Sequence, residues 1–392
     1  MDNFDFYSPT YFVFGKARQH ETGKYAKQYG ATKVLLHYGK GSVIKSGLLE
    51  QVKKSLDDAG IAYAELGGVE PNPKADIVYE GIELVRKEKV DFIIAVGGGS
   101  AIDSAKAIAI GALYDGDFWD FYVKRIVVEK AVPIGVVLTI AAAGSEGSPS
   151  SVITKDGNKR SLMFGSDLVR PKFAVLNPEL PATLPPYQVA CGGTDIMAHL
   201  LERYFTNTKN VETTDRMIEA LLLTMIEELP KVVKNPADYE SMANVMWAGS
   251  LAHNNVVGVG RSQDWASHRI EHELSALYGI AHGAGLAVVF PAWMKYTYEH
   301  DVERFARLAK NVWGIENGDK KEMALKAIQS FKDFWSSIGM PTTFEQINGK
   351  KEDIPFLAKN VTYTNAGDTV GGFVPLKEDD VVKIYGLMSN DK

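Results

Sequence analysis

Roughly the first 180 residues alternate short apolar runs with helical patterns, and this alternation restricts the possible folds more than any other feature. Four runs have the length and composition of strands: 33–38, 62–66, 91–96 and 133–139. Two segments between them have the apolar spacing of helices: 46–59 and 75–88. The third and fourth runs are almost continuously apolar, as strands buried on both faces are. The pattern predicts a parallel sheet with helices on both sides.

After residue 181 the pattern changes, because strand-like runs nearly vanish and long amphipathic segments such as 213–229 and 301–313 take over. Prolines in the segment 180–186 mark the change, since proline resists continuous helix. A chain of 392 residues is also too long for one ordinary domain. We therefore predict an α/β nucleotide-binding domain over residues 1–181 and an all-α metal-binding domain over residues 182–392.

Composition excludes several classes of partner. The net charge is −6 and no run of Lys and Arg is present, which argues against a nucleic-acid surface. The N-terminus lacks a signal-peptide pattern, and no apolar stretch reaches the length of a membrane span. Cys191 is the single cysteine, so no intrachain disulfide can form and a cytoplasmic location is expected. Because no activating base adjoins it in the sequence, we interpret Cys191 as a small packed residue.

A glycine-rich segment joins the third apolar run to the helical segment that follows it. Its residues are Gly97, Gly98, Gly99 and Ser100. Three glycines let backbone amides approach a ligand closely, Ser100 can cap the helix, and the helix N-terminus favours an anion. The segment matches neither the Rossmann nor the Walker spacing, and a tight strand-to-helix turn is the alternative interpretation. We expect it to bind the pyrophosphate of a nucleotide.

Two further segments follow strands of the same predicted sheet, where ligands of parallel sheets bind. One contains Thr139 and Ser145, separated by small residues that leave room for a ring or ribose. The other contains Gly39, Lys40 and Ser42, and it lacks the acidic residue that would bind ribose hydroxyls and repel a 2′-phosphate. Lys40 and Ser42 favour NADP(H) over NAD(H), although a solvated surface lysine explains the same pattern.

Histidines gather in two segments of the second half. Asp195 and His199 are four residues apart, so a helix carries them on one face. His268 and His272 repeat that spacing, and His282 follows. Imidazoles combined with a carboxylate suit a divalent transition metal such as Fe²⁺ or Zn²⁺.

Together these residues resemble the iron-containing (group III) alcohol dehydrogenase family, in particular its NADPH-dependent butanol dehydrogenases and broad-specificity aldehyde reductases. The resemblance covers nearly the whole chain. Three motifs carry it: Gly97-Gly98-Gly99-Ser100 with Asp103 and Lys106, Gly193-Thr194-Asp195 with His199, and His268-x3-His272-x9-His282-Gly283. It implies a dehydroquinate-synthase-like fold, a homodimer, and an active site between a nucleotide domain and a helical metal domain.

The resemblance also implies roles for individual residues. The metal ligands would be Asp195, His199, His268 and His282. Candidate cofactor contacts are Gly39, Lys40, Ser42, Gly97, Gly98, Gly99, Ser100, Asp103, Thr139, Ser145, Lys159 and Thr183. The chain departs from the family at Lys40, where the subgroup usually has Gly, and at Gly147-Ser148, where the family commonly has Met-Asn.

The expected reaction interconverts short aliphatic aldehydes, such as butanal, and primary alcohols. His272 is the candidate proton donor, because an ordinary histidine has a pKa near working pH, and a water relay is the alternative. A dehydroquinate-synthase-like lyase on the same fold is the alternative function. It would need several basic residues at the metal, and Arg269 is the only one in the two histidine segments. A non-enzymatic binding protein would not require this ligand set.

Overall fold

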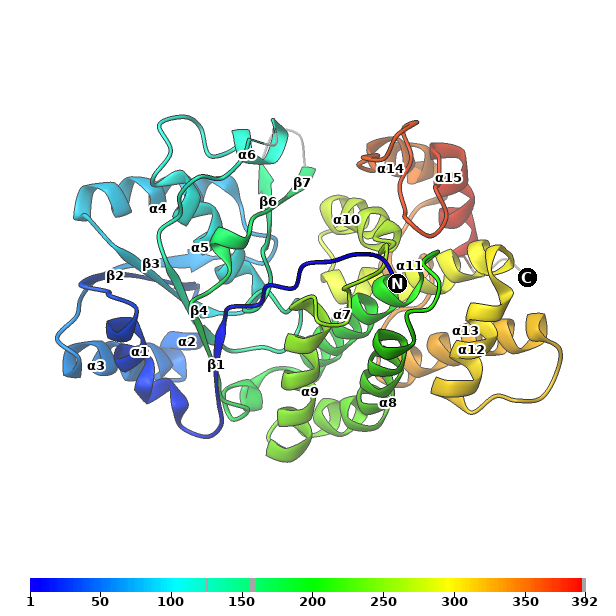
Figure 1. Ribbon diagram of the computed structural model, residues 1–392, viewed down its shortest axis with the longest axis horizontal. Helices are drawn as coiled ribbons and strands as arrows, with labels where there is room; N and C mark the ends of the chain where they lie inside the picture. The colour runs from blue at the N-terminus through cyan, green and yellow to red at the C-terminus, as the bar shows by residue number, and fades with distance from the viewer. Residues whose placement is uncertain (125, 156–159, 390–392) are drawn as a thin grey trace. The chain divides into compact units, whose positions relative to one another are not determined.

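The computed structural model describes residues 1–124, 126–155 and 160–389. The chain forms two compact units (Figure 1). The α/β unit consists of Tyr7–Leu184 and Ala237–Asn254, and the helical unit consists of Met1–Phe6, Pro185–Pro236 and Asn255–Lys392. Each unit combines more than one segment of the chain, so no single boundary separates them. The assignment of separate functions to residues 1–181 and 182–392 stays a prediction. None of the described helices is both long and apolar enough to cross a membrane.

A six-stranded, entirely parallel sheet forms the centre of the α/β unit, with the strand order β1-β8-β5-β4-β2-β3. The strands are β1 (Tyr11–Phe14), β2 (Lys33–Gly39), β3 (Ala62–Val69), β4 (Phe92–Gly97), β5 (Ile134–Leu138) and β8 (Phe173–Leu176). The predicted parallel sheet is therefore confirmed, and β2 to β5 coincide with the four predicted runs. A separate antiparallel pair, β6 (Ser150–Lys155) and β7 (Arg160–Gly165), was not predicted.

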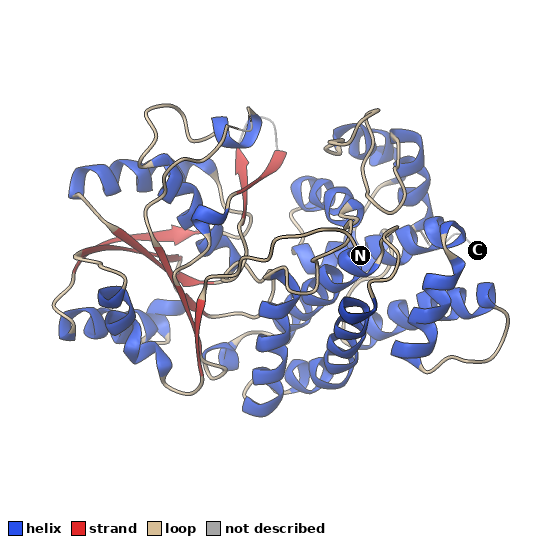
Figure 2. Cartoon of the chain, viewed as in Figure 1, coloured by secondary structure: helices blue, strands red, loops and turns tan. Residues whose placement is uncertain are grey.

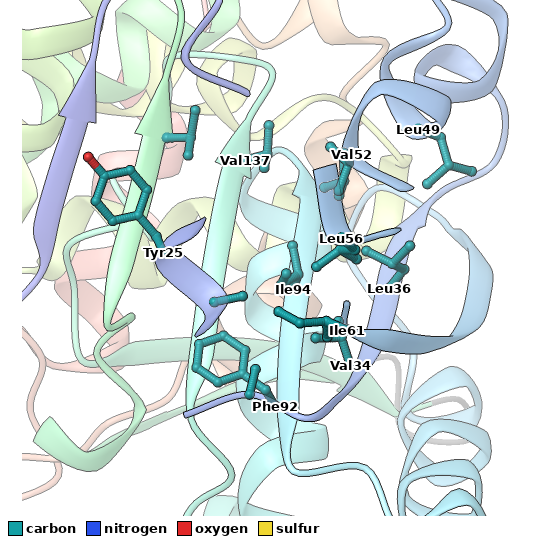
Figure 3. Packing of buried hydrophobic residues seen from close by; sticks show 14 of the residues in the cluster. Tyr25, Val34, Leu36, Leu49, Val52, Leu56, Ile61, Phe92, Ile94 and Val137 are labelled. Carbon is teal, nitrogen blue, oxygen red and sulfur yellow. The ribbon is translucent and has the colours of Figure 1, made fainter. Parts of the chain in front are cut away.

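Helices cover both faces of the sheet. The helices of this unit are α1 (Thr22–Gln28), α2 (Ser42–Lys45), α3 (Leu48–Asp58), α4 (Ala75–Glu88), α5 (Gly99–Gly111), α6 (Asp120–Val123) and α9 (Tyr239–His253). On one face Val52 and Leu56 of α3 belong to the same buried cluster as Val34 and Ile94 of the sheet (Figure 3). Fully burying such a side chain contributes about 1.5–3 kcal/mol. The opposite face is covered by α4 and α5, which match the predicted alternation.

Helix α9 packs into the α/β unit although it follows two helices of the helical unit in the sequence. The Ser250 hydroxyl of α9 donates a 2.6 Å hydrogen bond to the buried carboxyl group of Glu146. Gly144 has a φ of +62° and lies so close to α9 that a Cβ would be 2.6 Å from the His253 Cβ. These contacts tie α9 to the segment that follows β5.

The helical unit contains no strand among its described residues, apart from isolated bridges (Figure 2). Its helices are α7 (Pro186–Tyr204), α8 (Glu212–Lys234), α10 (Ala266–Tyr278), α11 (His282–Thr297), α12 (Val302–Trp313), α13 (Lys320–Ser337), α14 (Ile354–Asn360) and α15 (Glu378–Leu387). α7 and α11 are buried along most of their length, so they form the core of the unit. Polar side chains on these two helices are therefore held away from bulk water.

The carboxyl ends of β2, β4 and β5 lie side by side, because Tyr38 pairs with Val96 and Gly97 pairs with Leu138. The chain runs from β2 to β3 on one side and then returns to β4 on the other side. The strand order thus reverses between β2 and β4, and ligands of open parallel sheets bind at such a point. The predicted cofactor segments 39–42 and 97–100 leave the sheet there.

Candidate active site

The glycine-rich loop approaches its neighbours too closely for side chains. A Cβ on Gly98 would lie 2.4 Å from Ile140 Cγ2, and one on Gly97 would lie 2.8 Å from the Ala101 Cβ. The prediction that Ser100 caps the helix was wrong, because Gly98 is the N-cap of α5 and no described side chain caps it. The N-cap residue of α5 thus provides no side-chain acceptor, and an anion can bind at such a helix N-terminus.

Lys106 anchors the segment after β5 to α5. Its ammonium group is fully buried and donates to the carbonyl oxygens of Ser145, Ser148 and Ser150 at 2.7, 2.9 and 2.8 Å. Burial lowers the pKa of Lys106 to about 8, against the opposing charge of Asp103. Ser148 belongs to the pair Gly147-Ser148, where the resemblance leads us to expect Met-Asn, and its carbonyl takes part in this anchor. The bonds hold the segment next to the glycine-rich loop.

Several predicted cofactor contacts lie along this segment. Ser145 is buried and its hydroxyl donates to Asp103 at 2.6 Å, while the other Asp103 oxygen accepts from the N–H of Val152 at 2.9 Å. Thr139 directly follows β5, and Thr183 is exposed at the end of a short 3-10 helix. Lys159 lies outside the described residues. The contacts of these residues to a cofactor stay predictions.

Glu70 lies beside Lys40 and escaped the sequence reasoning. Gly39, the last residue of β2, pairs with Val69 of β3, so the residues that follow these two strands are neighbours. Lys40 forms an exposed ion pair with Glu70, and Ser42 begins α2. No acidic residue follows β2 directly in the sequence, whereas Glu70 follows the neighbouring strand. The segment thus places a cation beside a carboxylate.

Three helices bring the predicted metal ligands together. Asp195 and His199 lie one turn apart on α7, His268 lies on α10, and His282 is the first residue of α11. Gly279 ends α10 in the left-handed region, with a φ of +65°, as a glycine after a helix often does. The chain reverses there, and α11 begins three residues later, next to α10.

The nitrogens of three histidines surround one oxygen of Asp195. His268 Nε2, His199 Nδ1 and His282 Nε2 lie 3.6, 3.7 and 3.8 Å from Asp195 Oδ1. Donors on one tetrahedral metal ion at about 2.1 Å are about 3.4 Å apart, which is close to these distances. In the described part of the chain, one group with all its ligand atoms within 4.8 Å of one another comprises Asp195, His268 and His282. His199 adjoins this group, with its ring stacked on that of His268 at 4.7 Å.

Two of these atoms are suited to bind a cation. Asp195 Oδ1 and His268 Nε2 are buried without a hydrogen-bond partner among the described residues. Leaving a buried polar atom unsatisfied costs about 1–3 kcal/mol, so such atoms need an explanation. A carboxylate oxygen and an imidazole nitrogen that face each other across a few ångströms are suitable ligands for Fe²⁺ or Zn²⁺. The donor set therefore fits a divalent transition metal.

Two buried glutamates that the sequence reasoning missed lie beside the histidine rings. Glu202 Oε1 is 2.7 Å from His268 Nδ1, and Glu271 contacts His282 Nδ1. Burial lowers the pKa of His268, but the carboxylates of Asp195 and Glu202 outweigh it and raise the pKa to about 9. The spacing His-x-x-Glu, which occurs at His199 and again at His268, is the sequence feature that could have indicated these glutamates.

His272 lies beside the predicted ligands, with its ring centroid 5.5 Å from that of His282. Burial holds the pKa of His272 well below its usual range, and the positive charges of His282, His268 and Arg269 lower it further. The argument for His272 as proton donor starts from an ordinary histidine pKa, which this environment lowers. A neutral imidazole can still accept a proton at one nitrogen while it donates from the other. Its role stays a prediction.

Cys191 on α7 packs as the sequence reasoning expected. The thiol is buried, its sulfur lies 3.8 Å from Met340 Sδ, and burial raises the pKa of Cys191 to about 11. A Cβ on Gly283 would lie 2.0 Å from the Cys191 carbonyl oxygen, so α7 and α11 are in backbone contact here. That close approach places the N-terminus of α11, and with it His282, against the ligand helix.

Known proteins of one family match both halves of the chain. Residues 9–178 match the family described as iron-containing alcohol dehydrogenase, and residues 189–388 match the C-terminal part of the same family. The chain belongs to the iron-containing alcohol dehydrogenase family. It is 42% identical over 386 residues to the probable NADH-dependent butanol dehydrogenase 2 of Bacillus subtilis (strain 168), which covers 98% of this chain and 99% of the relative.

Two further relatives differ in the coenzyme that their names give. The NADPH-dependent aldehyde reductase YqhD of Escherichia coli (strain K12) is 38% identical over 364 residues, with 92% of this chain and 93% of the relative covered. A crystal structure of NADH-dependent butanol dehydrogenase A from Thermotoga maritima superposes with a TM-score of 0.96 at 40% identity, covering 100% of this chain and 99% of that one. The predicted family and the dehydroquinate-synthase-like fold are confirmed.

Membership in this family implies alcohol dehydrogenase or aldehyde reductase activity with a nicotinamide cofactor and a metal ion. The lyase alternative gains no support, because the matching families and relatives are dehydrogenases and reductases.

Proposed function

We propose that this protein interconverts short aliphatic aldehydes, such as butanal, and primary alcohols by hydride transfer with a nicotinamide coenzyme. The proposed metal is Fe²⁺, held by Asp195, His199, His268 and His282, with Zn²⁺ as the alternative. One observation carries the proposal. Asp195 Oδ1 and His268 Nε2 are buried without a hydrogen-bond partner among the described residues, and His282 lies beside them. The family to which the chain belongs is described as iron-containing.

Each part of the chain has a separate task in this reaction. A divalent ion in the ligand cage would supply Lewis-acid polarisation of a carbonyl oxygen. The glycine-rich loop and the N-terminus of α5 bind the coenzyme pyrophosphate, and Lys106 keeps the neighbouring segment in place. His272, as a neutral imidazole, passes a proton by accepting at one nitrogen and donating from the other. A water relay is the alternative path for that proton.

The proposed coenzyme is NADP(H), with Lys40 as the partner of the 2′-phosphate. Lys40 is 65% exposed and Glu70 is 42% exposed. An exposed ion pair of this kind contributes only about 0–1 kcal/mol, so Lys40 can exchange Glu70 for a phosphate at little cost. NAD(H) is the second candidate, because the Glu70 carboxylate can accept hydrogen bonds from ribose hydroxyls and some relatives are named as NADH-dependent.

Coenzyme choice is tested by kcat/KM for NADPH and NADH in the wild type, K40A and E70Q. If Lys40 binds the 2′-phosphate, K40A should lower kcat/KM for NADPH about tenfold, equivalent to about 1.4 kcal/mol, and leave the value for NADH unchanged. E70Q should then raise the value for NADPH. A loss for NADH alone in E70Q would favour NAD(H) instead.

The activity is tested with iron-loaded protein, NADPH and NADH in turn, and butanal, by following the absorbance of the reduced nicotinamide. We expect turnover by the wild type and none by H268A. This variant should still bind the coenzyme, because the proposed coenzyme-binding loops lie in the α/β unit. His300 is exposed and hydrogen-bonds Asn207, so H300A is the matched control and should keep full activity. Absence of oxidation with every short aldehyde would contradict the activity, and an active H268A would contradict the ligand assignment.

The remaining details are proposals with direct tests. Metal analysis of protein purified without added metal should find iron, and zinc would identify the alternative. Light scattering should give the mass of a homodimer, and cell fractionation should place the protein in the cytoplasm.

A further inference from the structure

The sequence His-x-x-Glu occurs once on each of two of the three helices that carry predicted ligands. His199 and Glu202 lie on α7, and His268 and Glu271 lie on α10. Residues three apart share a helix face, so each glutamate lies on the same side as a histidine. Each glutamate contacts the histidine of the next helix in this set: Glu202 contacts His268, and Glu271 contacts His282. The three helices are thus connected in series through carboxylate–imidazole contacts.

Glu202 holds His268 from behind. The Glu202 side chain is fully buried, and its Oε1 lies 2.7 Å from Nδ1 of His268. The same carboxylate accepts the backbone N–H groups of Trp265, at 2.7 Å, and of His268, at 3.0 Å. These bonds fix the carboxylate at the start of α10. The other ring nitrogen, His268 Nε2, lies 3.6 Å from Asp195 Oδ1 and has no hydrogen-bond partner in the described structure.

Glu271 holds His282 in the same way. Its side chain is fully buried, one oxygen contacts His282 Nδ1, and the other accepts the Ser275 hydroxyl. A Cβ on Gly285 would lie 2.3 Å from Glu271 Oε1, so the glycine leaves the space that the carboxylate occupies. His282 Nε2 again points toward Asp195, at 3.8 Å from Oδ1.

Both contacts select one tautomer. A carboxylate accepts a hydrogen bond, so it keeps the imidazole proton on Nδ1 and leaves the lone pair of Nε2 available for a metal ion. Resting on the proposed metal-dependent function, we propose that Glu202 and Glu271 are positioning residues that set the tautomer and ring orientation of His268 and His282. Removing such a partner from behind a ligand histidine typically weakens metal affinity 10- to 100-fold.

E271Q is the clearest variant. The glutamine carbonyl can accept from His282, and its amide can donate to Ser275, whose hydroxyl donates in turn to the Ile280 carbonyl. The packing is kept while the negative charge is lost. E202Q is less clean, because its amide would face backbone N–H groups that now donate to the carboxylate. Glu273 is buried on the same helix, so E273Q is the matched control.

Two quantities are measured on the full-length protein: the dissociation constant for Fe²⁺, by anaerobic competition with a chelator, and the Tm of the metal-free protein. We expect E271Q to bind Fe²⁺ 10- to 100-fold more weakly than the wild type, with E273Q within twofold. E202Q should show the same loss of affinity if it folds. A purely structural role would lower the Tm of the metal-free protein and leave the dissociation constant unchanged.

The outcomes separate this inference from the function on which it rests. If the wild type binds Fe²⁺ and reduces butanal while E271Q binds Fe²⁺ within twofold of it, the positioning role is wrong and the function stands. If the wild type neither binds Fe²⁺ nor reduces butanal, both are wrong.

Discussion

Protonation of His37 should make the stability of the α/β unit depend on pH. The ring is fully buried between β3 and α5, where Nδ1 donates to the Leu66 carbonyl at 3.1 Å and Nε2 accepts from the Ser104 hydroxyl at 2.6 Å. Burial lowers the pKa of His37 from 6.5 to about 4, although the bond to Leu66 opposes this. The folded protein therefore keeps His37 neutral where the unfolded chain takes up a proton.

The size of the effect follows from these two pKa values. Between pH 6.5 and pH 4 the unfolded state binds more protons at this position, so the free energy of unfolding falls as the pH falls. At pH 5 the loss is about 2 kcal/mol, and below pH 4 it levels off at about 3.4 kcal/mol. Above pH 7 the contribution is close to zero.

The assay compares wild type with H37N in urea unfolding at pH 7.5 and pH 5.0, followed by circular dichroism. The asparagine amide can still donate to the Leu66 carbonyl, but it does not titrate in this range. Between the two pH values the wild type should lose about 2 kcal/mol more than H37N, since the other titrating groups are common to both. Equal losses in the two proteins would refute the assignment of a low pKa to His37.

Two further substitutions test the coenzyme side. Gly98→Ala places a methyl group 2.4 Å from Ile140 Cγ2, so it should lower the free energy of unfolding by about 1–3 kcal/mol and weaken coenzyme binding in calorimetry at least tenfold. Adding Ile140→Ala should restore the free energy of unfolding but not the coenzyme affinity. Recovered coenzyme affinity would show that Gly98 is needed only for packing. Lys106→Met removes the ammonium donor from the carbonyl groups of Ser145, Ser148 and Ser150 and should cost about 3 kcal/mol, read from urea unfolding. An unchanged midpoint would contradict this role of Lys106.

The sequence predicted those parts of the fold whose pattern is local. The helix expected at 75–88 is α4 residue for residue, because its apolar spacing and its ends lie within one segment. β1 and β8 escaped notice because four residues are too few to show an alternation. The hairpin of β6 and β7 contains many polar residues, so its segments did not read as strands.

At the site, the division between predicted and missed residues has the same origin. Asp195 and His199 were found because their spacing is local. Glu202 and Glu271 were missed because a glutamate within an amphipathic helix usually faces solvent, and only tertiary packing buries these two. The ion pair of Lys40 joins two residues that follow adjacent strands and are far apart in the sequence. The burial of charged side chains and the contacts between distant elements thus could not be predicted from the sequence alone.

The position of α9 has a consequence during synthesis on the ribosome. The α/β unit cannot be completed when residue 184 emerges, because α9 and its Ser250 partner for the buried Glu146 come only after most of residues 185–254. At about 5–20 residues per second this delay lasts roughly 4–14 s. During that interval Glu146 lacks its Ser250 partner, and of the three helices with predicted metal ligands only α7 is synthesised. A gene fragment that ends at residue 184 would leave the protein in this state permanently.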